Sequence, residues 1–402
     1  MTSRIVELAR DRSVDLLRAC TTPDGFVASS RFDHYRSVWA RDACIAGLGA
    51  LVSNDPDLIA CAGATVDTLA ARMTPLGHVP AVVRPEAEEW DWGEGGVVDS
   101  NLWFVILAGR HLAVTGDLDR AGRWWPAVEL ALRWIAHQDV TGSGLISAAP
   151  STDWMDAALT RSGRTLHLNV LHAWAAREAA TTAGRLGREA PVDPDEIRRL
   201  VDTWFWPDPS IDVRSLYPHG FGHDALAVAY WEAASPSRTH YLSHIVHAGM
   251  IDKVDVLANL LAVVAGVAGV ARSRRILDEL GPEAYPHPTP SLLEAVQPGD
   301  PSAMLVSVAE AVIPPRWQNR PGRYHNGGSW PYIGGFHVLA EVSAGRPEHA
   351  AELLEAVAMS NSVDDWAFPE WIDSEGRPRG AAGQAWNAGA YLLGYRALRP
   401  AV

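Results

Sequence analysis

Apolar residues recur at helical spacing through nearly all of this 402-residue chain. Intervals of three and four residues predominate, whereas the two-residue alternation that is typical of strands is scarce. The spacing and its capping signals, such as Asp99 as the N-cap of the helix at 100–114, predict about a dozen helices. Their expected ranges are 5–19, 43–51, 58–71, 100–114, 118–137, 166–186, 195–205, 225–234, 250–271, 301–312, 331–343, 349–360 and 383–398.

The connections between these helices are alternately short and long, a pattern typical of helical hairpins that stack in a ring or a solenoid. The long connections are rich in Trp, His, Asp, Glu, Gly and Pro, and connections of this length in a compact domain are usually functional. No repeat of fixed period indicates an open array. We therefore predict an all-α fold in which residues 1–402 form a single domain, a closed toroid of six hairpins.

Composition excludes several classes of partner. The formal net charge of −14 argues against nucleic acid and against an anionic membrane surface, because both call for clustered Arg and Lys. The longest apolar run, 254–271, contains Asp255 and Asn259, so it predicts a buried helix and no membrane span. The N-terminus lacks the apolar core of a signal peptide, and the three cysteines lack the spacing of a zinc site or a disulfide framework. We expect a cytoplasmic protein.

The 17 tryptophans are unusual for a chain of this length. Indole rings stack on sugars and line polar funnels, although about half of them are expected in the core. The others gather in the long connections, beside carboxylate, amide and imidazole side chains that bind hydroxyl groups. The candidate substrate-binding residues are Trp39, Arg41, Asp42, Trp90, Trp92, Asp99, Asp153, Trp154, His325, Asn326, Trp330, Gln384 and Trp386. One alternative stays open within this set, because Asp42 could simply form an ion pair with Arg41.

Two acidic loops stand out. The stretch S-T-D-W-M-D-A carries Asp153 and Asp156 just before the predicted helix 166–186. An aspartate there could cap the helix, but one that packs against an indole and a thioether loses hydration, which favours its protonated form and suits a general acid. The stretch F-P-E-W-I-D carries Glu370. Glycosidic cleavage needs such a pair, because one carboxyl group protonates the departing oxygen while the other activates water or attacks carbon. We therefore predict Asp156 and Glu370 as the catalytic residues.

The stretch H-Y-L-S-H-I-V-H places His240, His244 and His247 at the spacing of one helical face, which is compatible with a metal site. No carboxylate or fourth ligand stands at a matching spacing. The sequence also lacks a phosphate loop, a dinucleotide fingerprint and the G-x-S-x-G elbow of serine hydrolases. We therefore predict no metal and no cofactor.

Taken in order, these stretches resemble the (α/α)6-toroid glycoside hydrolases that include the amylo-α-1,6-glucosidases and the neutral/alkaline invertases. The likeness runs from about Trp39 to Tyr395. The motif W-A-R-D resembles the segment that grips the non-reducing sugar, V-D-S-N-L-W-F-V-I-L resembles an invertase segment, and Y-H-N-G-G-S-W-P is similar to another motif of that family. W-M-D-A implies the general acid at Asp156, and F-P-E-W-I-D, followed by P-R-G-A-A-G-Q-A-W, implies the general base at Glu370. The resemblance implies an inverting mechanism.

Departures from these families bear on the substrate. The invertases have an Asp-Arg-Arg run at the acid where this chain has Asp156-Ala157-Ala158. Debranching enzymes carry extra domains, whereas we expect this chain to form only the toroid. We expect an exo-acting α-glucosidase that cleaves a short α-glycoside, either a disaccharide or a glucosylated metabolite, in a pocket closed by residues 86–96. Asp153 would either raise the pKa of Asp156 or bind the sugar.

Two other functions stay open. One is a sucrose-hydrolysing neutral/alkaline invertase. The other is a sugar isomerase, epimerase or sugar-binding toroid, because fold alone does not fix function. The histidines that it would use are His240, His244, His247 and His325. In each case the partner is a small carbohydrate, and a homo-oligomer is left open.

Overall fold

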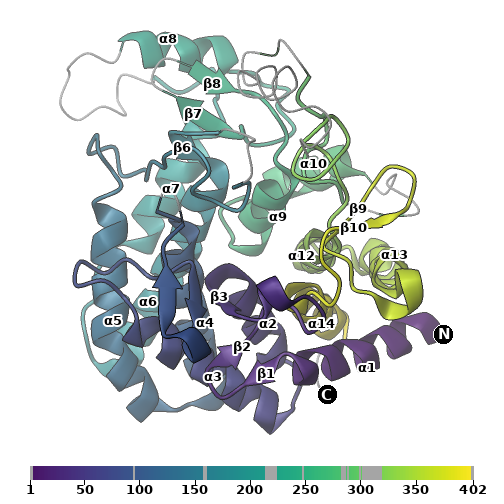
Figure 1. The fold of residues 1–402 in the computed structure, drawn as a ribbon. Helices are drawn as coiled ribbons and strands as arrows, with labels where there is room; N and C mark the ends of the chain where they lie inside the picture. Colours follow the sequence, from purple (N-terminus) through teal and green to yellow (C-terminus); the bar gives the residue numbers. More distant parts are fainter. Residues whose placement is uncertain are drawn as a thin grey trace.

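The computed structural model describes residues 3–93, 96–156, 161–212, 224–246, 249–281, 287, 289–297, 300 and 319–399. Within these residues six helices form an inner ring (Figure 1), in which each helix contacts the next and the last contacts the first. They are α2 (Ala40–Leu51), α4 (Asp99–Thr115), α6 (Leu166–Leu186), α9 (Val256–Val264), α12 (Pro331–Ser343) and α14 (Ala385–Leu398).

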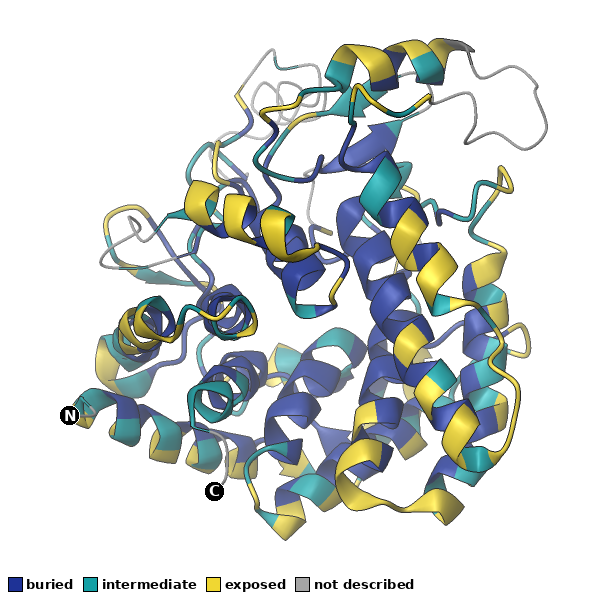
Figure 2. Ribbon diagram, turned by 180° about the vertical axis from the view of Figure 1, so that it is seen from behind, coloured by how far each residue is buried: buried dark blue, intermediate teal, exposed yellow. Residues whose placement is uncertain are grey.

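A second set of helices surrounds this ring. It consists of α1 (Arg4–Ala19), α3 (Pro56–Ala71), α5 (Leu118–Ala136), α7 (Pro194–Trp204), α10 (Val270–Leu280) and α13 (Pro347–Trp366). Each outer helix packs on one or two inner helices. The inner helices are almost wholly buried, whereas the outer helices expose one face to solvent (Figure 2). The chain is therefore an all-α double ring, as the sequence predicts.

The first and last helices close the ring. α1 lies against α14 and α13, with the two ends of the chain on the same side (Figure 1). The Tyr391 hydroxyl on α14 donates a hydrogen bond of 2.9 Å to the Val6 carbonyl oxygen. α2 and α14 approach so closely that a Cβ on Gly49 would lie 2.3 Å from the Cα of Gly389. Only glycine permits this backbone contact.

Short antiparallel strands occupy several of the connections that lead into the inner helices. β3 (Val38–Trp39), β4 (Val82–Arg84) and β5 (Glu89–Asp91) form one sheet, and β6 (Arg164–Thr165), β7 (His244–Val246) and β8 (Gly249–Ile251) form another, beside α8 (Asp224–Ala233) (Figure 1). Two-stranded sheets pair β1 (Thr21–Thr22) with β2 (Gly25–Phe26) and β9 (Trp371–Ile372) with β10 (Pro378–Arg379). Short helical turns lie at Asp33–Tyr35 and Pro85–Ala87.

The structure corrects three details of the sequence reading. The predicted helix 250–271 is wrong, because β8 precedes α9 and the left-handed conformation of Gly266 (φ +70°) follows the end of α9. Residues 270–280 then form α10, which the sequence reading missed. Asp99 does not cap α4, since Val98 occupies the cap and Asp99 is the first helical residue. The predicted helix 301–312 lies outside the described residues.

Two other expectations concern the core and the membrane. No helix among the described residues is long and apolar enough to cross a membrane. Cys20, Cys44 and Cys61 are buried free thiols in the hydrophobic core. The hydrophobic core fills the space between the inner and outer rings and continues across the N-terminal ends of the inner helices.

Candidate active site

The predicted site residues converge at one end of the toroid, where the inner helices begin. Arg41 and Asp42 lie in the first turn of α2, and Asp99 begins α4. Trp330 and Gln384 stand at the N-caps of α12 and α14. Helix N-termini carry partial positive charge, which favours anionic groups beside them. Residues that are far apart in the sequence therefore lie together at this end of the toroid.

Arg41 connects two carboxylates. Its Nε and Nη2 atoms lie 2.6 Å and 3.2 Å from the two carboxylate oxygens of Asp99, and its Nη1 lies 3.5 Å from Oδ2 of Asp156. Asp99 is completely buried. Burial raises the pKa of Asp99, although the adjacent guanidinium opposes the shift. Asp99 therefore holds Arg41 in place, and Arg41 in turn reaches the predicted acid.

Asp156 is set up as a proton donor. Its side chain is 42% exposed, so a substrate can reach it. Many protein atoms nevertheless surround the carboxyl group, and the desolvation that they cause raises its pKa to about 6, against the effect of Arg41 and with a contribution from the charge of Asp99. A carboxyl group with such a pKa remains partly protonated near neutral pH.

Glu370 is held by two hydrogen bonds. Its Oε2 accepts from the Ala381 backbone N–H at 2.9 Å, and its Oε1 accepts from the Tyr324 hydroxyl at 3.4 Å. Gly380 lets the carboxylate sit there, because a Cβ on this residue (φ +71°) would lie 2.1 Å from Oε2. Burial raises the pKa of Glu370 to about 7, and the charge of Asp156 adds to the rise. The two predicted catalytic carboxyls therefore influence each other across one site.

Asp42 is a third carboxyl group at this mouth. Burial raises its pKa to about 7, Arg41 opposes the rise, and the charges of Glu370 and Asp156 add to it. The ion pairs of Arg41 go to Asp99 and Asp156. This geometry favours the first of the two readings of Asp42, in which its oxygens accept hydroxyl groups of a ligand.

Aromatic rings form a buried floor below these carboxyls. Trp154 meets His325 and Trp330 edge to face at 5.2 Å and 5.6 Å, and Tyr332 stacks on Trp386 at 4.2 Å. The indole N–H of Trp154 and of Trp386, Nδ1 of His325 and the Tyr332 hydroxyl find no hydrogen-bond partner within the described structure. Buried polar atoms without partners are costly. Their concentration here indicates a place where water or a hydroxyl-rich ligand completes them.

Asp153 has a structural environment that differs from that of Asp156. It is buried and forms an ion pair with Arg161, with Nη2 and Oδ2 2.8 Å apart, and it accepts the Met155 backbone N–H at 3.0 Å. Burial alone would raise its pKa, but Arg161 outweighs that effect and the pKa lies below its ordinary value. Arg161 also contacts Asp255, the N-cap of α9. A buried triad thus anchors the segment that carries the predicted acid, Asp156.

Two predicted substrate-binding tryptophans, Trp90 and Trp92, lie at the edge of the sheet formed by β3, β4 and β5. Trp90, on β5, is 40% exposed and has the guanidinium of Arg72 5.2 Å from its ring centre. Trp92 donates its indole N–H to the His78 carbonyl oxygen at 3.2 Å. No described contact joins either ring to the carboxyl groups. The predicted covering loop is described only up to residue 93 and again from residue 96.

Two predicted substrate-binding residues, Asn326 and Gln384, form hydrogen bonds with the backbone through their side-chain amides. Asn326 accepts the Val296 N–H at 2.7 Å and donates to the carbonyl oxygens of Val296 and Asn319 at 2.9 Å and 3.0 Å. Both amide hydrogens are therefore in use. Gln384 is buried, and its Nε2 donates to the Ala381 carbonyl oxygen at 3.4 Å. These side chains shape the loops around Glu370.

Two tyrosines lie at the site although the sequence did not predict them as site residues. Tyr35 packs 5.4 Å from the ring of Trp39, and burial together with the charges of Glu370 and Asp42 raises its pKa. Tyr324, besides donating to Glu370, stacks on His325 at 4.1 Å. Both lie inside long connections, but periodicity does not indicate which loop residues point inward.

The histidines do not share a helical face. His240 lies in a loop, where its Nε2 is 2.8 Å from Asp252, and His244 is on β7. His247 lies outside the described residues. Among the residues that the structure describes, no group of three His, Cys, Asp or Glu side chains could hold a metal ion.

The closed ring of six helical hairpins, with carboxyl groups gathered at one end, is the fold of the toroid glycoside hydrolases, and solved structures of that class match it. The GH63 mannosylglycerate hydrolase from Thermus thermophilus, in complex with Tris and D-glycerate, superposes with a TM-score of 0.68 at 16% identity over 96% of this chain and 99% of that chain. A rhamnosidase from Klebsiella oxytoca with rhamnose bound gives 0.64 at 15% identity over 98% of this chain and 64% of the rhamnosidase.

Curated relatives carry invertase names. The chain is 24% identical over 451 residues to alkaline/neutral invertase E, chloroplastic, of Arabidopsis thaliana. The aligned region covers 95% of this chain and 71% of the relative. It is 24% identical over 347 residues to neutral/alkaline invertase 3, chloroplastic, of Oryza sativa subsp. japonica, across 78% of this chain and 54% of the relative. A comparison with protein families finds no match.

Proposed function

We propose that this chain is an inverting glycoside hydrolase that cleaves a short α-glycoside, with Asp156 as general acid and Glu370 as general base. One observation carries the proposal: two carboxyl groups from separate loops face the same site, with pKa values raised to about 6 and about 7. Glycosidic cleavage needs one neutral carboxylic acid and one carboxylate on opposite sides of the bond. The toroid fold and the names of the relatives agree with this chemistry.

The contacts support a separate task for each group. Asp156, reached by Arg41, donates its proton to the glycosidic oxygen as the bond to the anomeric carbon breaks. Glu370, held by Ala381 and Tyr324, takes a proton from water, whose oxygen bonds to the anomeric carbon from the opposite face. Two products result, an alcohol and a sugar of inverted configuration. The proton balance returns when Glu370 passes its proton to solvent and Asp156 regains one.

The proposed substrate is a short α-glucoside, either a disaccharide or a glucosylated small metabolite. The solved neighbour that superposes at a TM-score of 0.68 is titled a mannosylglycerate hydrolase, and the curated relatives are named invertases. The names of the relatives are the observation that keeps sucrose as a second candidate. No observation favours the histidine-based isomerase, because burial lowers the pKa of His244 to about 4 and that of His325 far below its ordinary value.

Product analysis tests the proposal. Sucrose, isomaltose, trehalose and glucosylglycerate would each be incubated with the protein, and the first anomer released would be followed by NMR. We expect β-glucose to appear first from one α-glucoside. Release from sucrose alone would assign the invertase reading, and α-glucose as the first product would overturn inversion. Interconversion of free sugars without hydrolysis would overturn the hydrolase.

The pH dependence of kcat/KM should be a narrow bell. Below pH 6 both catalytic carboxyls are protonated and the base is lost, whereas above pH 7 both are ionised and the acid is lost. With pKa values of about 6 for Asp156 and about 7 for Glu370, the reactive form, with Asp156 protonated and Glu370 ionised, is the less populated of the two singly protonated forms. Its population is still greatest between pH 6 and pH 7, where the maximum is expected. The two limbs belong to the coupled pair. A profile that stays flat from pH 5 to pH 8 would contradict the assignment.

We also propose that the protein acts in the cytoplasm. The three cysteines are buried free thiols among residues that the structure describes, and proteins of oxidising compartments more often use disulfides. Fractionation of the native source, followed by immunoblotting, tests this location.

A further inference from the structure

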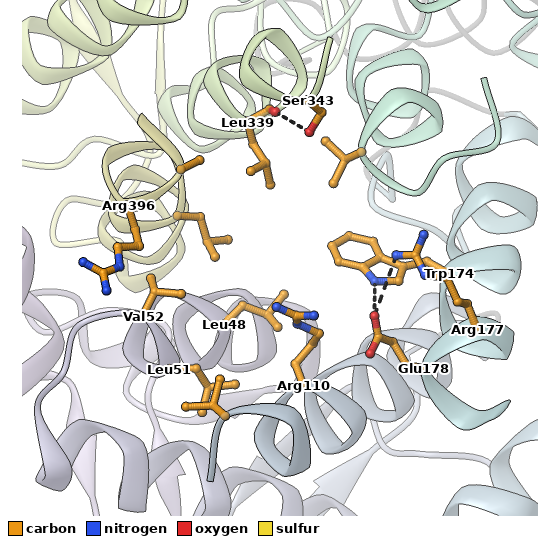
Figure 3. Close-up of a pocket in the computed structure, with 14 residues that line it drawn as sticks. Leu48, Leu51, Val52, Arg110, Trp174, Arg177, Glu178, Leu339, Ser343 and Arg396 are labelled. Atoms are coloured by element: carbon orange, nitrogen blue, oxygen red, sulfur yellow. Dashed lines mark hydrogen bonds and ion pairs between the residues drawn. The ribbon is translucent and has the colours of Figure 1, made fainter. Parts of the chain in front are cut away.

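A cavity of about 470 Å³ lies at the opposite end of the toroid from the carboxyl groups. All six inner helices contribute to its wall through their middle and C-terminal turns (Figure 3). Arg110 is eleven residues beyond Asp99 on α4, which places the cavity about 16 Å along the helix axis from the candidate active site. None of its lining residues belongs to that site. The size is within the range of small-molecule pockets.

The wall is mainly apolar. Trp174 on α6 turns its ring toward the cavity, opposite Leu48 of α2 and Leu339 of α12 (Figure 3). The indole N–H of Trp174 donates to Oε1 of Glu178 at 2.9 Å. This hydrogen bond satisfies the polar edge of the indole and leaves its ring face for an apolar ligand.

Three arginines stand in this wall, in a protein whose net charge is −14. Two of them satisfy backbone carbonyl groups near helix ends: Arg177 donates to the Ala265 oxygen at 2.6 Å, and Arg396 to the Arg399 oxygen at 3.5 Å. Both neutralise the negative ends of helices, an ordinary structural role. Glu178, the acidic group of the wall, already accepts from Trp174 and lies 3.7 Å from Arg177.

Arg110 differs from the other two arginines. It lies more than one turn before the end of α4, where helical carbonyl groups already have partners. It is exposed to solvent at the cavity wall and forms no hydrogen bond or ion pair within the described part of the chain, and its guanidinium points toward the cavity (Figure 3). A cation beside apolar walls fits a ligand that has an apolar body and one anionic group.

We propose that this cavity binds a small amphiphilic carboxylate, with its apolar part against Trp174 and Leu48 and its carboxylate on Arg110. Such a ligand would contact every inner helix at the end that lies away from the catalytic groups. If the ligand binds the folded protein and not the unfolded chain, ligand concentrations above Kd should raise the thermal stability of the protein.

Octanoate and its uncharged analogue octanamide are suitable probes, measured by calorimetry and by thermal unfolding of the full chain. Octanoate should bind saturably and at least tenfold more tightly than octanamide. Arg110→Gln should remove that difference, whereas Arg188→Gln, at an exposed position on the outside of the molecule, should keep it. Val114→Trp should weaken both probes, because Val114 is 44% exposed at the cavity wall and the larger ring would fill space there.

Three results would overturn the proposal: no saturable binding of octanoate, equal affinity for the two probes, or unchanged octanoate affinity in Arg110→Gln. Each readout is independent of sugar hydrolysis. Failure of this proposal is therefore distinguishable from failure of the proposed catalytic function.

Discussion

Replacement of Glu370 by glutamine is expected to lower kcat by a factor on the order of 10² to 10⁴ while making the protein more stable at pH 8. The loss of rate follows because glutamine cannot take a proton from the attacking water, and a positioned general base contributes about that factor. Glutamine retains the shape of glutamate. Its oxygen can still accept from the Ala381 N–H, and its NH₂ group can donate to the Tyr324 oxygen, so the fold should persist.

The gain in stability follows from the raised pKa of Glu370. In the unfolded chain this carboxyl ionises near 4.5, whereas in the folded protein its pKa is about 7. As pH rises through this window, the unfolded chain releases the proton first, so folding loses stability, by at most about 3 kcal/mol above pH 7. Glutamine has no such penalty. We expect a higher midpoint of thermal unfolding for the variant at pH 8 and a much smaller difference at pH 5.

A matched control is Glu375→Gln, which changes an exposed glutamate in the same loop. It should leave both kcat and the pH dependence of unfolding close to those of the parent protein. If Glu370→Gln retains turnover, the assignment of the base is wrong. If turnover is lost but stability at pH 8 falls, burial of the ionised Glu370 carboxylate does not destabilise the folded protein.

The role of Asp156 can be separated from that of Glu370 by the leaving group. Asp156→Asn should reduce hydrolysis of an unactivated α-glucoside far more than that of a dinitrophenyl α-glucoside, because a good leaving group departs without a proton. Glu370→Gln should reduce both to a similar extent, since both need activated water. Equal losses in Asp156→Asn would contradict its assignment as the acid.

Much of the ring could be predicted from the sequence because helical periodicity reports which face of a segment is buried. The expected helices 166–186 and 331–343 coincide with α6 and α12. The prediction failed at 250–271, where the apolar residues suit either a strand or a helix and periodicity does not reveal the left-handed conformation of Gly266. Apolar composition alone does not locate a chain reversal.

The site was less predictable than the ring. Motifs drew attention to Asp156 and Glu370, whose roles remain proposals, but nothing in the sequence indicated that Asp99 would be fully engaged by Arg41. Nor did it show that Asn326 would serve the backbone or that Tyr324 would reach a carboxylate. These distinctions depend on loop conformations, and Tyr324 itself has a positive φ of 46°. Residue type indicates which groups can bind a sugar, whereas loop geometry decides which groups are free to do so.

The second large effect is expected at Arg161, which we infer positions the acid without touching the substrate. Its guanidinium is buried between Asp153, three residues before Asp156, and Asp255 at the start of α9. Arg161→Met would leave two buried carboxylates without a counter-charge, and breaking a buried ion pair in this way costs about 3 to 5 kcal/mol. In the parent protein Asp153 has a lowered pKa. Its contribution to stability is therefore present at neutral pH and is lost as the pH falls below the pKa of an ordinary aspartate.

In Arg161→Met the pKa of both aspartates should rise, so the deficit should be largest at neutral pH and should shrink toward pH 5 as they take up protons. Chemical denaturation at pH 7.5 and pH 5 measures this. Adding Asp153→Asn and Asp255→Asn should recover part of the stability, because asparagine is neutral and still caps α9, yet kcat should remain low if the triad positions Asp156. Arg377→Met, which removes a half-exposed partner of Asp373, should cost far less, because solvent screens an exposed ion pair. A deficit at Arg161 no larger than that of this control would show that the triad does not anchor the acid segment.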